Sequence, residues 1–171
     1  MNKFATIIPI NRFSRTKVKI YTVQIEDETG IKAETEFENW ISRHQSDLEI
    51  QKDLGLIRSW VEIISKGKHN LNILLRDENA AHALPPKTKF LEIDYAPTLR
   101  LYGMVIGNKT LILFNGGIKT KAKAQDCPNV APYFHEANKL CRAIEESLRD
   151  SLELNYSTGE FNNPDQTEID L

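Results

Sequence analysis

The chain has 171 residues, 40% of them hydrophobic and 27% charged, and a formal net charge of −2, which suits one domain with appendages. Two cysteines exclude a disulfide framework, and no apolar run approaches the roughly 18 residues of a membrane span, so we expect a cytoplasmic protein. The charge balance excludes a uniformly basic nucleic-acid coat but leaves room for a local basic site.

The N-terminal half begins with residues 1–16, which are expected to form an irregular arm. A strand is predicted over 17–25, where apolar residues alternate. Two amphipathic helices are expected next, the first over 34–45 and the second over 48–66. Each helix carries a tryptophan on its apolar face, and we assign both to a core that covers a sheet: Trp40 and Trp60.

The C-terminal half contains three runs that favour β-structure, at 90–95, 99–105 and 110–114, and their short links predict an antiparallel meander. A helix is expected over 129–154, and the acidic residues 155–171 are expected to be a disordered tail. The order predicts an α+β fold in which two N-terminal helices pack on a small antiparallel sheet and a C-terminal helix follows. No βαβ crossover is expected, and therefore no parallel sheet.

A basic segment lies between Asp94 and Asp126, where no acidic residue occurs. Lysines at alternate positions of an extended strand share one face. Arg100 faces away from the leucines on either side of it, so it lies on the open face of the sheet if they face the core. Two interpretations stay open: a surface for RNA or DNA phosphates, and a solvated sheet edge where lysines prevent aggregation. The basic residues are Arg100, Lys109, Lys119, Lys121 and Lys123.

The other polar motifs are less specific. Asn115-Gly116-Gly117 lacks the spacing of a phosphate-binding loop, so it is interpreted as a strand-end turn with Asn115 as a polar contact. The histidines are scattered, and the set Cys127, His135 and Cys141 has no recognised zinc spacing. We expect no metal and no cofactor.

The segment from Leu99 to Lys121 resembles the RelE/HigB/ParE toxin superfamily, in particular its phage-derived HigB-like branch. An arginine-bearing strand, Leu99–Tyr102, precedes an apolar run, Ile112–Phe114, and a basic end, Ile118–Lys121. The resemblance implies a RelE-like domain over residues 17–154, between the arm and the tail.

The resemblance also implies a function: the toxin of a type II toxin–antitoxin pair that cleaves mRNA without a metal, on or off the ribosome. The partners would be a helix-turn-helix antitoxin and RNA or the ribosome, with no membrane. The catalytic residues carried over by position are Arg100, Lys119 and Lys121, and the expected RNA-binding residues are Lys87, Lys89, Asn115 and Lys123.

No general base is identified from the sequence, although Tyr133 and His135 are candidate counterparts of the histidine and tyrosine of active members. The alternative is a non-catalytic protein-binding module on the same fold. It would inhibit a target such as gyrase, as ParE-like members do, or be an inactive phage or mobile-element protein.

Overall fold

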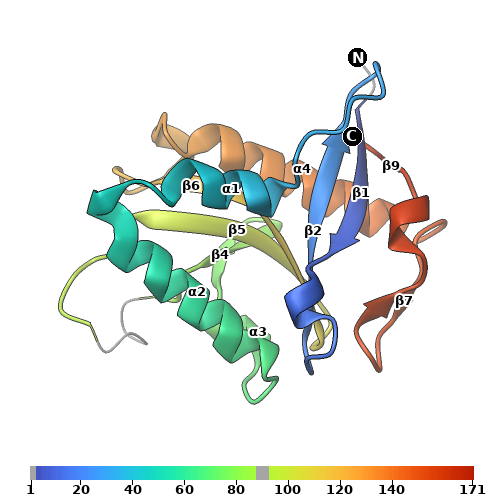
Figure 1. Cartoon of the computed structure of the whole chain (residues 1–171), viewed down its shortest axis with the longest axis horizontal. Helices are drawn as coiled ribbons and strands as arrows, with labels where there is room; N and C mark the ends of the chain where they lie inside the picture. The colour runs from blue at the N-terminus through green and yellow to red at the C-terminus, as the bar shows by residue number, and fades with distance from the viewer. Residues whose placement is uncertain (1–2, 88–92) are drawn as a thin grey trace.

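The computed structural model describes residues 3–87 and 93–171, which form an α+β fold with helices on both faces of one curved sheet (Figure 1). The helices are α1 (Glu36–His44), α2 (Gln51–Ser65), α3 (Leu71–Leu74) and α4 (Ala131–Ser147). The longer strands are β1 (Phe4–Pro9), β2 (Lys19–Glu26), β5 (Leu99–Ile106) and β6 (Thr110–Ile118). The shorter strands are β3 (Arg76–Glu78), β4 (Ala81–Leu84), β7 (Leu154–Asn155), β8 (Glu160–Phe161) and β9 (Ile169–Asp170).

The main sheet of the described chain has seven strands in the order β3-β4-β5-β6-β2-β1-β9. Strands β2 and β6 run parallel, from Lys19 opposite Thr110 to Thr22 opposite Leu113, while the other neighbours are antiparallel. The prediction of two N-terminal helices on a small antiparallel RelE-like sheet is therefore wrong. Two strands precede the first helix, and the sheet is large and mixed.

The central hairpin matches the predicted runs at 99–105 and 110–114 and turns at Gly107, whose φ of +61° suits glycine. A bulge between Leu101 and Gly103 shifts the register. The third strand of the meander is β4, not the predicted run at 90–95. Residues 90–92 lie outside the described residues, and 93–95 are not in a strand.

The helices predicted at 34–45 and 48–66 are present as α1 and α2. Helix α1 begins at a capping box, in which the Thr35 side chain accepts a bond from Glu38 N–H and the Glu38 side chain accepts one from Thr35 N–H. Its buried residues include Trp40, which is fully buried, whereas Trp60 on α2 is half-buried. Both helices lie on the same face of the sheet (Figure 1).

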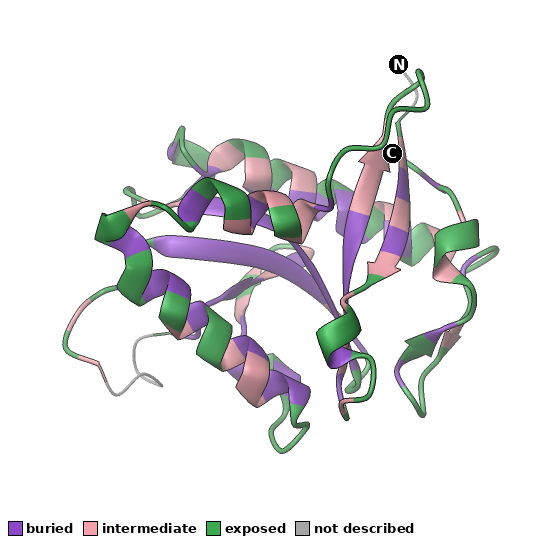
Figure 2. Cartoon of the chain, in the orientation of Figure 1, coloured by how far each residue is buried: buried purple, intermediate pink, exposed green. Residues whose placement is uncertain are grey.

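Helix α4 covers the opposite face of the sheet, so the central strands are buried on both sides (Figure 2). Trp40, Leu99 and Leu101 belong to the core under α1 and α2, while Tyr102 and Phe134 belong to the core under α4. The expectation that Arg100 lies on an open face is therefore wrong. Because helices cover both faces of the central strands, neither face is open to solvent at Arg100.

The terminal segments complete the edge of the sheet. Residues 1–16 were expected to be irregular, but β1 lies among them and pairs with β2 along its full length. Residues 155–171 were expected to be disordered, yet Ile169 is fully buried and β9 pairs with β1. Phe161 contacts the Tyr21 ring edge-on at 4.9 Å, so buried apolar side chains anchor this acidic segment.

Candidate functional site

Arg100 is 7% exposed and points into the protein. Its Nη1 donates to the carbonyl oxygens of Pro97 at 2.9 Å and Leu99 at 3.0 Å. Burial, together with the nearby Arg76 guanidinium, lowers the pKa of Arg100 to about 10. A side chain held in this way fixes the start of β5, and it is poorly placed to contact an RNA phosphate.

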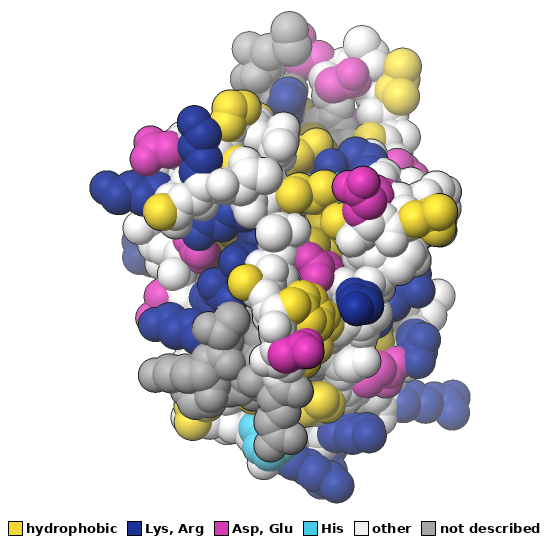
Figure 3. Space-filling model, turned by 90° about the vertical axis from the view of Figure 1, so that its left-hand side faces the viewer, with side chains coloured by type: hydrophobic (Ala, Val, Ile, Leu, Met, Phe, Trp, Pro, Cys, Tyr) yellow, Lys and Arg dark blue, Asp and Glu magenta, His cyan; other side chains and the backbone are white. Residues whose placement is uncertain are grey.

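The three lysines expected on a strand face lie beyond the end of β6, at Ile118, in the loop that leads to α4. Lys119 is half-buried, and its backbone N–H donates to Thr98 O at 2.8 Å. Lys121 and Lys123 are exposed, and none of the three forms an ion pair with a described residue. Figure 3 shows this end of the molecule, with Lys and Arg side chains on both its left and its right side.

Lys87 is exposed, whereas Lys89 lies outside the described residues. Asn115 was expected to be an exposed contact, but it is 5% exposed. The structure thus places Lys119, Lys121 and Lys123 in one loop beside the start of β5, where the Arg100 side chain is buried and does not join them at the surface.

Asn115 lies where β2 and β6 diverge, because their parallel pairing ends at Leu113. Beyond that point, side chains of α1 replace the missing strand. Asn115 Nδ2 donates to Glu36 Oε2 at 3.0 Å and to Asn39 Oδ1 at 2.9 Å. Arg43 Nη2 donates to Asn115 Oδ1 and, at 2.6 Å, to Gly116 O.

Gly116 is required at this position, because a Cβ there would overlap the carbonyl group of Arg100 on β5. The close approach of β5 and β6 leaves Gly116 O pointing at Arg43. Helix α4 closes the other side, where the Tyr133 ring lies 4.3 Å from the Arg43 guanidinium carbon.

A crevice of about 520 Å³ opens between the first turns of α1 and α4. We call it the α1–α4 crevice. Its position follows from the topology, since β2 leads to α1 on one face of the sheet and β6 leads to α4 on the other. Ligands of open α/β sheets bind at such a switch point. The residues that line it include Ile25, Glu36, Pro132, Tyr133 and Glu136.

Two titratable groups of this crevice have a shifted pKa: hydrogen bonds from Thr29 lower the pKa of Asp27, whereas the pKa of Glu36 is raised. Burial raises its pKa, the neighbouring Glu136 raises it further, and the Asn115 hydrogen bond and the Arg43 charge act in the opposite direction. Its Oε1 atom accepts no hydrogen bond from a described residue. A carboxylate with a raised pKa and a free oxygen is suited to take a proton from a substrate.

Sequence reasoning did not identify Glu36 or Arg43, and it named Tyr133 only as a candidate. The available signal was the spacing of Glu36, Asn39 and Arg43, which places three polar residues along one side of α1. The strand that these residues contact could not be predicted, because the contact joins positions 36–43 to 115–116.

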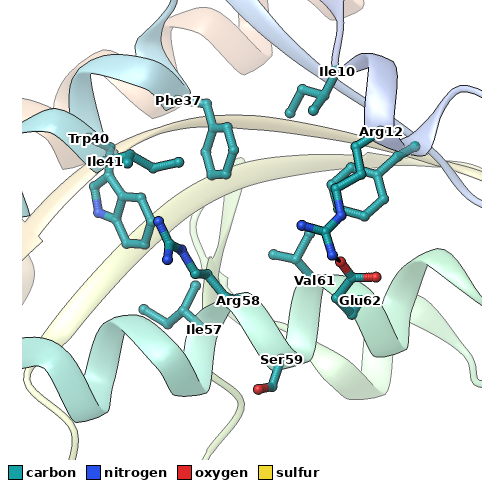
Figure 4. A pocket seen from close by; sticks show the side chains of 11 residues that line it. Ile10, Arg12, Phe37, Trp40, Ile41, Ile57, Arg58, Ser59, Val61 and Glu62 are labelled. Carbon is teal, nitrogen blue, oxygen red and sulfur yellow. Dashed lines mark ion pairs between the residues drawn. The ribbon is translucent and has the colours of Figure 1, made fainter. Parts of the chain in front are cut away.

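A second cavity, of about 530 Å³, lies between α1 and α2 and is mainly apolar (Figure 4). We call it the α1–α2 pocket. An ion pair at this pocket, Arg12–Glu62, joins the segment after β1 to α2. The pocket and the α1–α4 crevice lie on opposite sides of α1.

No family model, curated protein or solved structure matches the chain. None of the helices in residues 3–87 and 93–171 is long and apolar enough to cross a membrane. The described residues also contain no group of three or more His, Cys, Asp or Glu side chains that could hold a metal ion.

Proposed function

We propose that the protein binds RNA at the end of the sheet where β6 stops and cleaves it in the α1–α4 crevice, with Glu36 as the general base. The observation that carries the proposal is the Glu36 carboxylate with its raised pKa, held by Asn115 beside Arg43. Asn115 and Arg43 lie next to the end of β6, which leads to Lys119, Lys121 and Lys123, and these lysines form no ion pair with a described residue.

The lysine loop supports binding of the RNA backbone. Tyr133 stacks on Arg43 and lies next to Gly117, where a Cβ would be 3.5 Å from its ring, two residues before Lys119. Phosphates bound along the loop would therefore lead to the crevice. Contacts to phosphates by exposed lysines give affinity that depends on salt and little on sequence.

Arg43 takes the role that the sequence assigned to Arg100. It is an exposed guanidinium whose Nη2 is committed to Asn115 and Gly116, while its Nη1 has no hydrogen bond to a described residue. A guanidinium held in this way can donate to a phosphate oxygen and stabilise the charge that develops on it.

The proposed reaction is an internal transfer within the RNA. Glu36 takes the proton of a ribose 2′-hydroxyl, whose oxygen then bonds to the adjacent phosphorus. The bond from phosphorus to the 5′-oxygen breaks, and that oxygen takes a proton from water. The products are a 2′,3′-cyclic phosphate and a 5′-hydroxyl end.

A 5′-labelled RNA of mixed sequence tests the proposal, with and without ribosomes, by the rate of cleavage and the chemistry of the new ends. Glu36→Gln should slow cleavage by about 10²- to 10⁴-fold, the usual contribution of a general base. Glu145→Gln, an exposed carboxylate further along α4, is the matched control and should keep the wild-type rate.

Cleavage by Glu36→Gln at the wild-type rate would refute the role of Glu36. Absence of cleavage by the wild type, both with and without ribosomes, would refute the proposed RNA cleavage. A toxin role adds one further expectation: expression without an antitoxin should arrest growth, and Glu36→Gln should relieve the arrest.

A further inference from the structure

We propose that the α1–α2 pocket binds an amphiphilic monocarboxylate, such as a medium-chain fatty acid or an aryl carboxylic acid, with its carboxylate on Arg58. This site is independent of the proposed RNA cleavage. The pocket is formed by Phe37, Trp40 and Ile41 of α1, by Ile57, Arg58 and Val61 of α2, and by Ile10 and Phe13 near β1 (Figure 4).

The floor of the pocket is buried and apolar. Trp40 and Ile57 are fully buried, and Val61 is 3% exposed. The Trp40 ring is fixed in orientation because its Nε1 donates to Arg100 O at 3.1 Å. Phe37 stacks against Trp40 with ring centroids 5.9 Å apart, and both Phe37 and Ile41 are half-buried, so they form walls that a ligand can cover.

The size of the pocket favours a small molecule as the occupant. A volume of about 530 Å³ falls within the roughly 300–1,000 Å³ of small-molecule sites. Such sites combine apolar walls with a few polar groups that fix orientation, and this pocket offers two arginines, one glutamate and Ser59.

The charges of the pocket select one negative group. Arg12 is neutralised by its ion pair with Glu62. Arg58 is an exposed cation on α2 that forms no ion pair or hydrogen bond with a described residue, and Figure 4 shows its guanidinium beside the Trp40 ring. One uncompensated guanidinium matches one carboxylate, which it can hold by two parallel hydrogen bonds.

A neutral amphiphile of the same length would contact the apolar walls but give Arg58 no negative partner, so it should bind more weakly than the carboxylate. Decanoate and decanol therefore form a matched pair of probes. Binding to the full chain is measured by isothermal titration and by tryptophan fluorescence, below the concentration at which decanoate forms micelles. We expect decanoate to bind with higher affinity than decanol.

Arg58→Gln should weaken decanoate binding by about tenfold, the loss expected for one charge-assisted contact, and should leave decanol binding unchanged. Arg15→Gln, an exposed arginine outside the pocket, is the control and should change neither. Ile41→Asp should weaken both ligands by placing a carboxylate in the apolar wall, with folding checked by circular dichroism.

Equal decanoate affinity in wild type and Arg58→Gln would overturn the proposal, as would absence of decanoate binding to the wild type. RNA cleavage by Arg58→Gln at the wild-type rate would show that the pocket and the crevice act separately. If the wild type binds decanoate but does not cleave RNA, the proposed RNA cleavage is refuted and the proposed ligand site in the α1–α2 pocket is supported.

Discussion

Helix α1 has two flanks that meet their neighbours in opposite ways. On the flank toward β6 and α4, Glu36, Asn39 and Arg43 contact their surroundings through directed hydrogen bonds. On the flank toward α2, Phe37 and Trp40 pack through apolar surface in the α1–α2 pocket. One helix of nine residues therefore borders both candidate sites.

The two flanks should therefore tolerate different substitutions. A hydrogen-bonded network fails when one partner is removed, because the remaining buried polar atoms lose their bonds. An apolar surface tolerates changes of shape that conserve volume, and it fails when volume is lost. Single substitutions on each flank can therefore test this difference.

The largest expected effect is on the apolar flank. Trp40→Ala should lower the free energy of unfolding by about 3–5 kcal/mol, because it leaves a cavity in the core and removes the indole donor from Arg100 O. Urea unfolding measures it, with the half-buried Trp60→Ala as the comparison. A larger loss for Trp60→Ala would contradict the assignment of Trp40 to the centre of this core.

On the polar flank, Asn115→Ala should cost about 1–3 kcal/mol of unfolding free energy, because Glu36, Asn39 and Arg43 each lose a hydrogen bond. The measurement is again urea unfolding. Asn72→Ala is the control, since that side chain is exposed on α3. A cost equal to that of the control would mean that the network adds nothing to stability.

Glu36→Gln should have a smaller effect on stability, and of the opposite sign at neutral pH. Because the pKa of Glu36 is raised in the folded state, the folded protein binds the proton more tightly than the unfolded chain does. Stability therefore falls as pH rises from the unfolded pKa through the folded one. At pH 7 the variant should unfold at a higher temperature than the wild type.

The gain in unfolding temperature should shrink as the pH falls below the unfolded pKa of Glu36, where both proteins are uncharged at this position. Scanning calorimetry at several pH values from 3 to 7 measures the trend. A gain that grows toward low pH would mean that the carboxylate is stabilising, and that its pKa is lowered.

The smallest effect on stability is expected at the lysine loop. Lys121→Gln should change the free energy of unfolding by less than about 0.5 kcal/mol, because the side chain is exposed and unpaired within the described chain. Its effect should appear in RNA binding, where the slope of affinity against salt falls by about one. An unchanged salt slope would remove Lys121 from the RNA surface.

The helices of this fold could be predicted from the sequence because their signal is local. The periodicity of apolar residues marks α1, α2 and α4, and the β-favouring runs mark β5 and β6. The short edge strands carry too few residues for a pattern. β9 has only two residues, and it becomes a strand because Ile169 is buried beside β1.

The candidate site was predicted less well, because its parts meet only through the tertiary fold. Arg100 was assigned to an open face by alternation, but α4 covers the face that alternation leaves free. Asn115-Gly116-Gly117 was interpreted as a strand-end turn, but the motif lies within β6, where Asn115 is buried and bonds to residues of α1 far away in the chain. The resemblance to RelE-like toxins remains a prediction.

The short parallel pairing of β2 with β6 also bears on the order in which the molecule folds. Lys19–Thr22 and Thr110–Leu113 are far apart in the chain, whereas β5 and β6 are joined by a tight turn. Closing a long loop costs chain entropy before the contacts it brings together can compensate for that cost. We therefore expect the β5–β6 hairpin to form early and the parallel β2–β6 pairing to form late. Folding would then end by joining two preassembled halves, and substitutions at this seam should change the unfolding rate more than the folding rate.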